Sequence, residues 1–173
     1  MATALFITKE DIVKNTSISG SVDSDKFLQY VQLAQEIHVQ NLLGTDLYDK
    51  IGSLIIDGNG IMPDGDYKNL VKEYIRPILI HFGMVEYLGF APYTISNAGV
   101  YKHSIETSET ASKEDVDFLV GKHKNYADYY SSRLIEYLCT SGTRDRFPEY
   151  YTNTDNDIRP DKDVTYAPWN LRH

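Results

Sequence analysis

The sequence predicts a mainly α-helical fold, a small bundle with two long antiparallel helices. The first long helix is expected over residues 64–91, where apolar side chains recur at the i, i+3, i+4, i+7 spacing of one helix face. The second is expected over residues 112–140, where apolar positions follow a 4-3-4-3 spacing. Residues 92–112 have no helical period, so an extended loop or β-hairpin insertion, turning near residues 97–99, is expected between them.

Two helices are expected before residue 44. Thr8 and Asp11 can cap a short helix that ends near Lys14. A second helix is expected over residues 24–43, closed by Gly44 as its C-cap. Its apolar residues cover a wide face, so burial on more than one side is expected; they are Phe27, Tyr30, Val31, Leu33, Ala34, Ile37 and Leu42.

The start of each later helix is also marked by a capping residue. Thr45 is expected to cap a third, shorter helix over residues 46–56. Asp64 or Asp66 is expected to cap the first long helix. Pro77 lies inside that helix and removes one backbone hydrogen bond, which predicts a kink near residues 73–75.

The second long helix is expected to begin at a cap formed by Ser112 and Asp115. Because it is only three heptads long, packing against the first long helix is favoured over a coiled-coil dimer. The residues expected on its inner face are Val116, Val120, His123, Ala127, Tyr130, Leu134 and Tyr137.

The end of the chain differs from the rest, which predicts a helical domain over residues 1–141 and an extended C-terminal arm over residues 142–173. The arm holds three of the six prolines and has no helical period, yet it carries five aromatic residues. Docking of the arm on a neighbouring surface is favoured over disorder until assembly, and packing on its own domain is a third alternative. The residues expected at interfaces are Phe147, Tyr150, Tyr151, Tyr166 and Trp169 of the arm, and Tyr93, Ile95, Val100 and Tyr101 of the insertion.

Composition excludes several classes of protein. The 173 residues suit one domain, and the net charge of −8 opposes nonspecific binding to nucleic acid or to anionic membranes. The single cysteine, Cys139, excludes an intramolecular disulfide and a cysteine-rich zinc site. No run reaches the roughly 18 apolar residues of a membrane span, and residues 1–14 lack the pattern of a signal peptide, so synthesis in a cytoplasm is expected.

The sequence predicts no catalytic residue, no cofactor and no metal site. The five histidines lie on different expected elements without a metal-binding spacing, and His123 is expected to be a core histidine. Residues 57–60 begin like a calcium loop, but Ile61 and Lys68 stand where such a loop needs ligands. The helices around Gly44 resemble a helix-turn-helix in outline, but Asp46 and Asp49 would repel DNA phosphates.

Several motifs, in this order, carry a resemblance to a known family. They are Phe6-Ile7-Thr8-Lys9-Glu10-Asp11-Ile12, Leu43-Gly44-Thr45-Asp46-Leu47-Tyr48-Asp49-Lys50-Ile51, the tyrosine-rich helix over 74–87, Asn97-Ala98-Gly99-Val100, the trio Tyr126, Tyr130 and Leu134, and Phe147-Pro148-Glu149-Tyr150. With these elements the chain resembles the head–tail connector (head-completion or adaptor) ring proteins of tailed double-stranded DNA phages, including those of crAss-like phages.

The resemblance implies a non-enzymatic virion protein. In that family a small helical bundle forms a homo-oligomeric ring, often of twelve copies, between the portal protein and the neighbouring ring proteins of the head–tail junction. DNA passes through such a ring without sequence-specific binding, and an acidic subunit suits this because each Lys or Arg facing a phosphate would add affinity. The alternative is a small cytoplasmic helical enzyme or regulatory binding protein.

Overall fold

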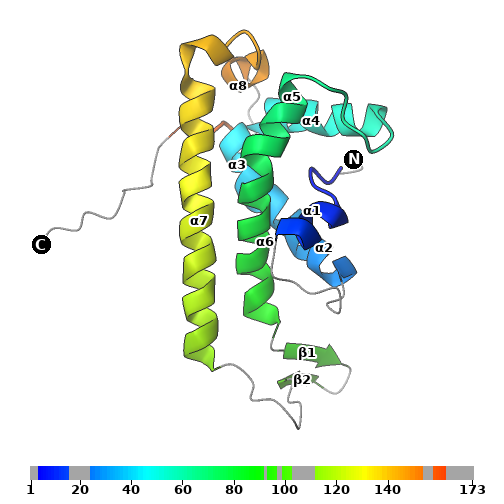
Figure 1. Cartoon of the computed structure of the whole chain (residues 1–173), viewed down its shortest axis with the longest axis vertical. Helices are drawn as coiled ribbons and strands as arrows, with labels where there is room; N and C mark the ends of the chain where they lie inside the picture. Colours follow the sequence, from blue (N-terminus) through cyan, green and yellow to red (C-terminus); the bar gives the residue numbers. More distant parts are fainter. Residues whose placement is uncertain are drawn as a thin grey trace, which may run out of the picture.

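A computed structural model of the chain describes residues 4–15, 24–91, 93–96, 99–102, 112–153 and 158–162. The described chain is mainly helical, which confirms the predicted fold class. Figure 1 shows two long helical columns that lie side by side, with α1, α2 and α4 on the far side of the first column from α7, and with α8 at the top between the columns. The elements are α1 (Lys9–Asn15), α2 (Ser24–Ala34), η1 (Gln35–Val39), α3 (Gln40–Leu43), α4 (Thr45–Asp57), α5 (Asp66–Leu70), η2 (Val71–Ile75), α6 (Arg76–Phe90), β1 (Tyr93–Ser96), β2 (Gly99–Lys102), α7 (Lys113–Cys139), η3 (Ser141–Thr143) and α8 (Pro148–Thr152).

The N-terminal segment is fixed to the bundle by a cap and by one buried amide. The Thr8 amide donates to Asp11 Oδ2 at 3.1 Å, and the Asp11 amide donates to Thr8 Oγ1 at 3.3 Å, which confirms the predicted cap of α1. Gln35, which is fully buried, accepts a hydrogen bond from the Phe6 amide at 2.9 Å and donates to the Ala4 carbonyl at 2.9 Å. These bonds hold Phe6 in the core.

The predicted helix over residues 24–43 is present as α2, η1 and α3 in succession, with a π-helical turn at η1. It ends at Gly44, as predicted, with φ at +75°. Burial on more than one side is wrong, however, because Leu33 and Ile37 are exposed. The helix packs against α6 mainly through Phe27 and Val31, so its opposite face remains open.

The structure corrects two predicted caps. Thr45 is the first residue of α4 rather than its cap, and its side-chain oxygen accepts a hydrogen bond from the Ile158 amide at 3.3 Å. Gly65, and neither neighbouring aspartate, precedes the first turn of α5. Asp64 instead pairs with Lys68 at 2.6 Å. The side chains of Thr45 and Asp64, which the sequence predicts as helix caps, are thus bound by Ile158 and Lys68 instead.

The first long helix consists of α5, η2 and α6. Its π-helical turn, η2, lies over residues 71–75, just before Pro77, and the Arg76 amide bonds to the Val71 carbonyl five residues back. Proline cannot donate the bond that would continue a regular helix at this point. The irregularity therefore occurs where Pro77 predicts one.

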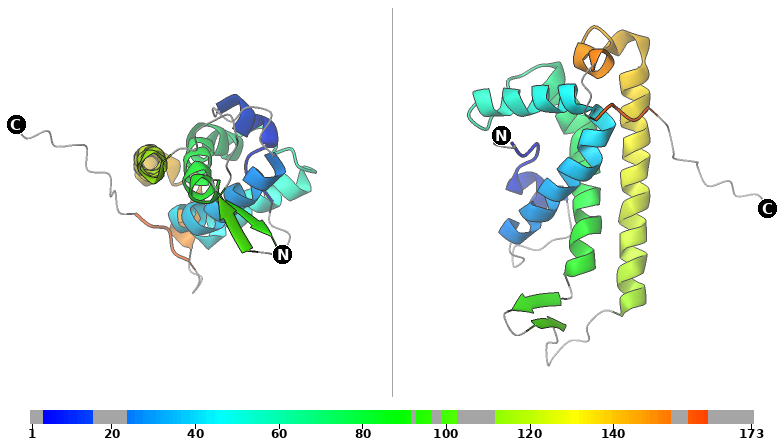
Figure 2. Two further views of the ribbon diagram at one scale, coloured as in Figure 1. Left: turned by 90° about the horizontal axis from the view of Figure 1, so that it is seen from below. Right: turned by 180° about the vertical axis from the view of Figure 1, so that it is seen from behind.

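The second long helix, α7, begins at the predicted capping box. The Asp115 amide donates to Ser112 Oγ at 3.1 Å, and the Ser112 amide donates to Asp115 Oδ2 at 3.1 Å. Ala127 and Leu134 are fully buried on the side that faces α6. Figures 1 and 2 show α7 running antiparallel to α6 within one chain, as the sequence predicts.

The described residues of the insertion, 93–96 and 99–102, form the paired strands of a β-hairpin, the second of the two predicted alternatives. Strands β1 and β2 pair in antiparallel, with Tyr93 opposite Lys102 and Ser96 opposite Gly99. In Figure 1 the hairpin lies beyond the end of α6, at the level of the first turns of α7.

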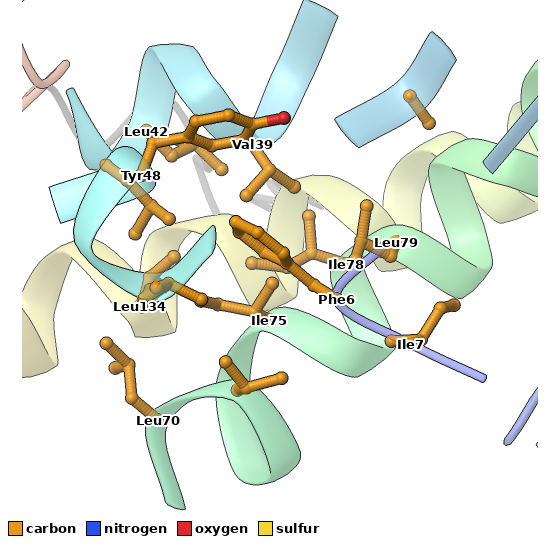
Figure 3. Close-up of a cluster of buried hydrophobic side chains, with 14 of the residues drawn as sticks. Phe6, Ile7, Val39, Leu42, Tyr48, Leu70, Ile75, Ile78, Leu79 and Leu134 are labelled. Carbon is orange, nitrogen blue, oxygen red and sulfur yellow. The ribbon is translucent and has the colours of Figure 1, made fainter. Parts of the chain in front are cut away.

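The core lies where α6 meets the N-terminal segment, α3, α4 and α7. Figure 3 shows Phe6, Leu42, Tyr48, Leu79 and Leu134 converging from these five segments. Ile75, Ile78 and Leu79 are fully buried. The π-helical turn and α6 therefore supply the centre of the bundle, as the sequence predicts.

The structure contradicts part of the predicted C-terminal arm. Phe147 and Tyr150 are buried in the chain's own core, and Phe147 lies edge-on to Tyr67 with ring centroids 5.3 Å apart. Tyr151 is half-buried and donates to the Leu138 carbonyl. The boundary at residue 141 and the assignment of Phe147 and Tyr150 to an interface between chains are therefore wrong. These rings cover the open end of the bundle beyond the last turn of α7.

Residues 158–162 also lie on the helical domain. The Thr45 amide donates to the Ile158 carbonyl at 3.0 Å, and the Asp161 amide donates to the Asn41 carbonyl at 2.8 Å. A Cβ at Gly44 would lie 2.6 Å from Pro160 Cδ, so this close approach needs glycine. Figure 2 shows the segment crossing α3. Tyr166 and Trp169, the other predicted interface residues of the arm, lie outside the described residues.

Candidate functional site

The strongest candidate site is an exposed aromatic face on α7. Phe118, Tyr126 and Tyr129 are 63%, 51% and 42% exposed. With Lys122 and Arg133 they follow spacings of four, four, three and four residues, which place all five side chains on one helix face. We call these five residues the outer stripe. Phe118, Lys122 and Tyr129 lie on the side of the helix away from the buried Ala127 and Leu134, while Tyr126 and Arg133 also reach the first column: the Tyr126 ring is 5.2 Å from that of His81, and the Arg133 guanidinium is 5.8 Å from the centre of the Tyr74 ring.

Cationic side chains lie over the rings of the outer stripe. The Lys122 Nζ atom is 5.5 Å from the centre of the Phe118 ring, and the Arg133 guanidinium is 6.0 Å from the centre of the Tyr129 ring. Aromatic residues and arginine are enriched in the cores of protein interfaces, whereas lysine is depleted there. The stripe therefore has the composition of a surface that another protein covers, with Lys122 placed as an interface rim residue.

The outer stripe is not among the residues predicted from the sequence, because only the period of the inner face of this helix underlies that prediction. A second 3–4 period of aromatic residues runs along the opposite face, and that period is the signal in the sequence. The predicted interface residues of the insertion do lie together. Tyr93 and Ile95 are on β1, and Val100 and Tyr101 are on β2, with Ile95 opposite Val100. Their role in an interface remains a prediction.

A histidine pair joins α6 to α7. The Nδ1 atoms of His81 and His123 are 3.1 Å apart, so one imidazole donates a hydrogen bond to the other. The rings of Tyr126 and Tyr130 lie 5.2 and 5.7 Å from that of His81. Burial, and then the positive charge that His123 can carry, lower the pKa of His81 to about 4; burial also lowers the pKa of His123. Both rings are therefore neutral near pH 7.

A cleft of about 410 Å³ adjoins this pair. It is lined by Asn15, Lys72, Glu73, Arg76, Pro77, Ile80, His81 and Tyr130. Arg76 pairs with Asp11 at 3.2 Å, while its Nε atom is buried without a hydrogen-bond partner. The cleft therefore combines both signs of charge with an apolar wall. Within the described parts of the chain, no three His, Cys, Asp or Glu side chains are grouped to hold a metal ion.

The histidine pair gives a pH dependence with a definite sign. His81 has a pKa of about 4 in the folded chain against an ordinary 6.5, so between these values the unfolded chain binds a proton that the folded chain does not. The free energy of unfolding is therefore expected to fall as the pH is lowered from about 6.5 to about 4. Urea unfolding at several pH values measures this slope. His81→Asn should flatten this slope. An unchanged slope in that variant would mean that other titrating groups cause the pH dependence.

The comparisons with known proteins show a family. No described helix has both the length and the apolar character to cross a membrane. A search of curated proteins found no match, and a search of solved structures found none. Residues 39–160, more than two thirds of the chain, match the model of a family described as a family of unknown function, DUF6712. The matched part runs from the last residue of η1 through α8 to Pro160. The chain therefore belongs to the DUF6712 family.

Proposed function

We propose that the chain is a structural, non-enzymatic subunit of a head–tail connector ring in a tailed double-stranded DNA phage. In this proposal the ring sits below the portal protein in the virion and forms part of the DNA channel that joins head and tail. The resemblance described above supports it through the order of elements: a capped short helix, two long antiparallel helices, an insertion between them, and an aromatic C-terminal segment.

The observation that carries the proposal is the outer stripe on α7. A helix with one buried face normally presents charged and small polar residues on the other. Here Phe118, Tyr126 and Tyr129 take that place, and their area is removed from water only if another molecule covers it. A subunit whose function is to be packed between neighbours needs such a surface.

The charge of the chain agrees with a DNA channel. A net charge of −8 suits a channel through which a polyanion slides, since the 17 Lys and Arg residues, which would release counterions from the phosphates, are outnumbered by 25 Asp and Glu residues. The cationic members of the outer stripe, Lys122 and Arg133, lie over aromatic rings, so we assign them to the protein interface rather than to the channel wall.

A second function, a small helical enzyme or regulatory binding protein, is favoured by one observation. The cleft beside His81 has the size of a small-molecule site and contains a buried arginine atom without a partner. In that case the side chains of His81 and Arg76 would contact the ligand, and the outer stripe would have no part in the activity.

Electron microscopy and light scattering of the purified chain distinguish the two functions. The connector subunit is expected to form rings, or to enter rings when mixed with the portal protein. His81→Gln and His123→Gln should leave those rings unchanged wherever the variant folds. A chain that stays monomeric with the portal protein present would contradict the proposal, as would a turnover that is lost in a folded His81→Gln variant.

A further inference from the structure

A second exposed apolar surface lies at the end of α4. Ile56 and Ile61 are 52% and 73% exposed, and Asp57 is exposed between them. The turn that joins them is tight: the Gly60 amide donates to the Ile55 carbonyl at 2.8 Å, and the Ile61 amide donates to the Gly58 carbonyl at 3.0 Å. We call Ile56, Asp57 and Ile61 the acidic tip. Its side chains are held on a rigid turn.

The outer stripe and the acidic tip lie on opposite sides of the molecule. In Figure 1, α7 forms one side, and the free end of α4 points away from it on the other side of α6. The view from behind in Figure 2 gives the same arrangement. In both views α4 lies at the level of the last turns of α7, which hold Arg133, rather than at the level of Phe118.

The chemistry of the two surfaces is complementary. The outer stripe carries two cations, Lys122 and Arg133, and none of its five members is acidic. The acidic tip offers the exposed carboxylate of Asp57, which follows the exposed Ile56 in the chain and precedes the exposed Ile61 by four residues. Two stripes packed on each other would bring four cationic side chains into one interface, whereas a stripe packed on a tip pairs opposite charges beside apolar area.

We infer that neighbouring copies of this chain join head to tail, with the outer stripe of one copy packed against the acidic tip of the next. Arg133, together with the preceding Tyr129, then contacts Ile56 and Asp57 at the end of α4, because α4 lies at the level of the last turns of α7. A contact between two different surfaces leaves one of each free on every dimer, so it adds further copies until a ring closes. The inference rests on the self-assembly in the proposed function and names the surfaces that make it.

Cysteine cross-linking tests the contact directly. The exposed Cys139 is first replaced by serine, and Tyr129→Cys and Ile56→Cys are then made singly and together. Under mild oxidation the double variant is expected to give a ladder of covalent oligomers. A mixture of the two single variants should give dimers only, and each single variant alone should give monomers. Tyr129→Cys combined with Val13→Cys, an exposed position on α1, is the matched control and should give no ladder.

Charge reversal provides a second measurement that does not depend on cysteine geometry. Arg133→Glu and Asp57→Arg are each expected to weaken self-association at least tenfold in sedimentation experiments, and the chain with both changes should recover most of the loss. Dimers from Tyr129→Cys alone would indicate stripe-on-stripe packing and would overturn the inference. The inference would also be overturned if neither single charge reversal weakened self-association.

The outcomes separate this inference from the proposed function. Rings seen by electron microscopy in the absence of a cross-link between residues 129 and 56 would overturn the surface assignment and leave the connector proposal standing. A ladder and a charge-reversal rescue in a protein that builds open filaments and never joins the portal protein would support the head-to-tail contact and contradict the connector proposal.

Discussion

Deletion of residues 144–173 is expected to give a chain that no longer unfolds cooperatively. The deletion removes Phe147 and Tyr150, which are buried, and the Glu149 carboxylate that accepts a hydrogen bond from the Tyr67 hydroxyl at 2.8 Å. Truncating one buried phenylalanine to alanine costs about 3–5 kcal/mol, and a domain is stable by only about 5–15 kcal/mol. The free energy lost with both rings and with the covered end of the bundle is therefore close to, or larger than, the whole free energy of unfolding. Circular dichroism during thermal unfolding measures the result.

A shorter deletion provides the matched control. Removing residues 163–173 leaves α8 and its buried rings in place, as well as residues 158–162, so the melting temperature should match that of the full chain. Because Tyr166 and Trp169 are predicted interface residues, the same deletion should fail to complement assembly of infectious particles. If the deletion at residue 144 melts like the full chain, Phe147 and Tyr150 do not stabilise the fold. If the shorter deletion still assembles, Tyr166 and Trp169 are dispensable.

The C-terminal segment shows how far composition can be interpreted. For Phe147 and Tyr150 the aromatic content correctly indicates covered side chains, since both are buried. What composition cannot give is the covering surface, because the same rings could bury against a neighbour or against their own domain. Pro148, the first residue of α8, is a local helix-start signal that would have favoured packing of the segment on its own domain.

The predicted caps at Thr8 and Ser112 are correct, whereas those at Thr45 and at Asp64 or Asp66 are wrong. The boxes at Thr8 and Ser112 involve partners three residues away, so the sequence contains both halves of each motif. At Thr45 the side chain instead bonds to Ile158, more than a hundred residues further along the chain. No local pattern contains such a partner, and the prediction failed there.

The candidate surfaces were harder to predict than the core. Apolar periodicity identifies the face of α7 that contains Leu134, because burial dominates the pattern. The outer stripe is a weaker period on the same helix, and the acidic tip is formed by a turn with no period at all. The meeting of His81 with His123 likewise depends on how α6 and α7 are aligned along their length, which separate helix patterns do not specify.

Leu79→Asp is expected to abolish folding. Leu79 is fully buried in the first turn of α6, where Figure 3 shows it beside Ile78 and near Phe6. A carboxylate there would lose its hydration without gaining a partner, and the neutral acid would still lack hydrogen bonds. The expected loss in the free energy of unfolding is larger than that of a usual point mutation, which is about 0.5–3 kcal/mol. Circular dichroism should show a loss of helix content and of the cooperative melting transition.

Phe118→Asp is the control for that substitution, because it places the same charge on the outer stripe of the neighbouring helix. Phe118 is exposed, so the variant should keep its helix content and melting temperature. Leu79→Met preserves volume and should cost less than about 1.5 kcal/mol. A folded Leu79→Asp variant with the melting temperature of the original chain would mean that α6 does not form the centre of the core. Unfolding of Phe118→Asp would mean that the outer stripe is covered within its own chain, and the case for an interface on α7 would then be lost.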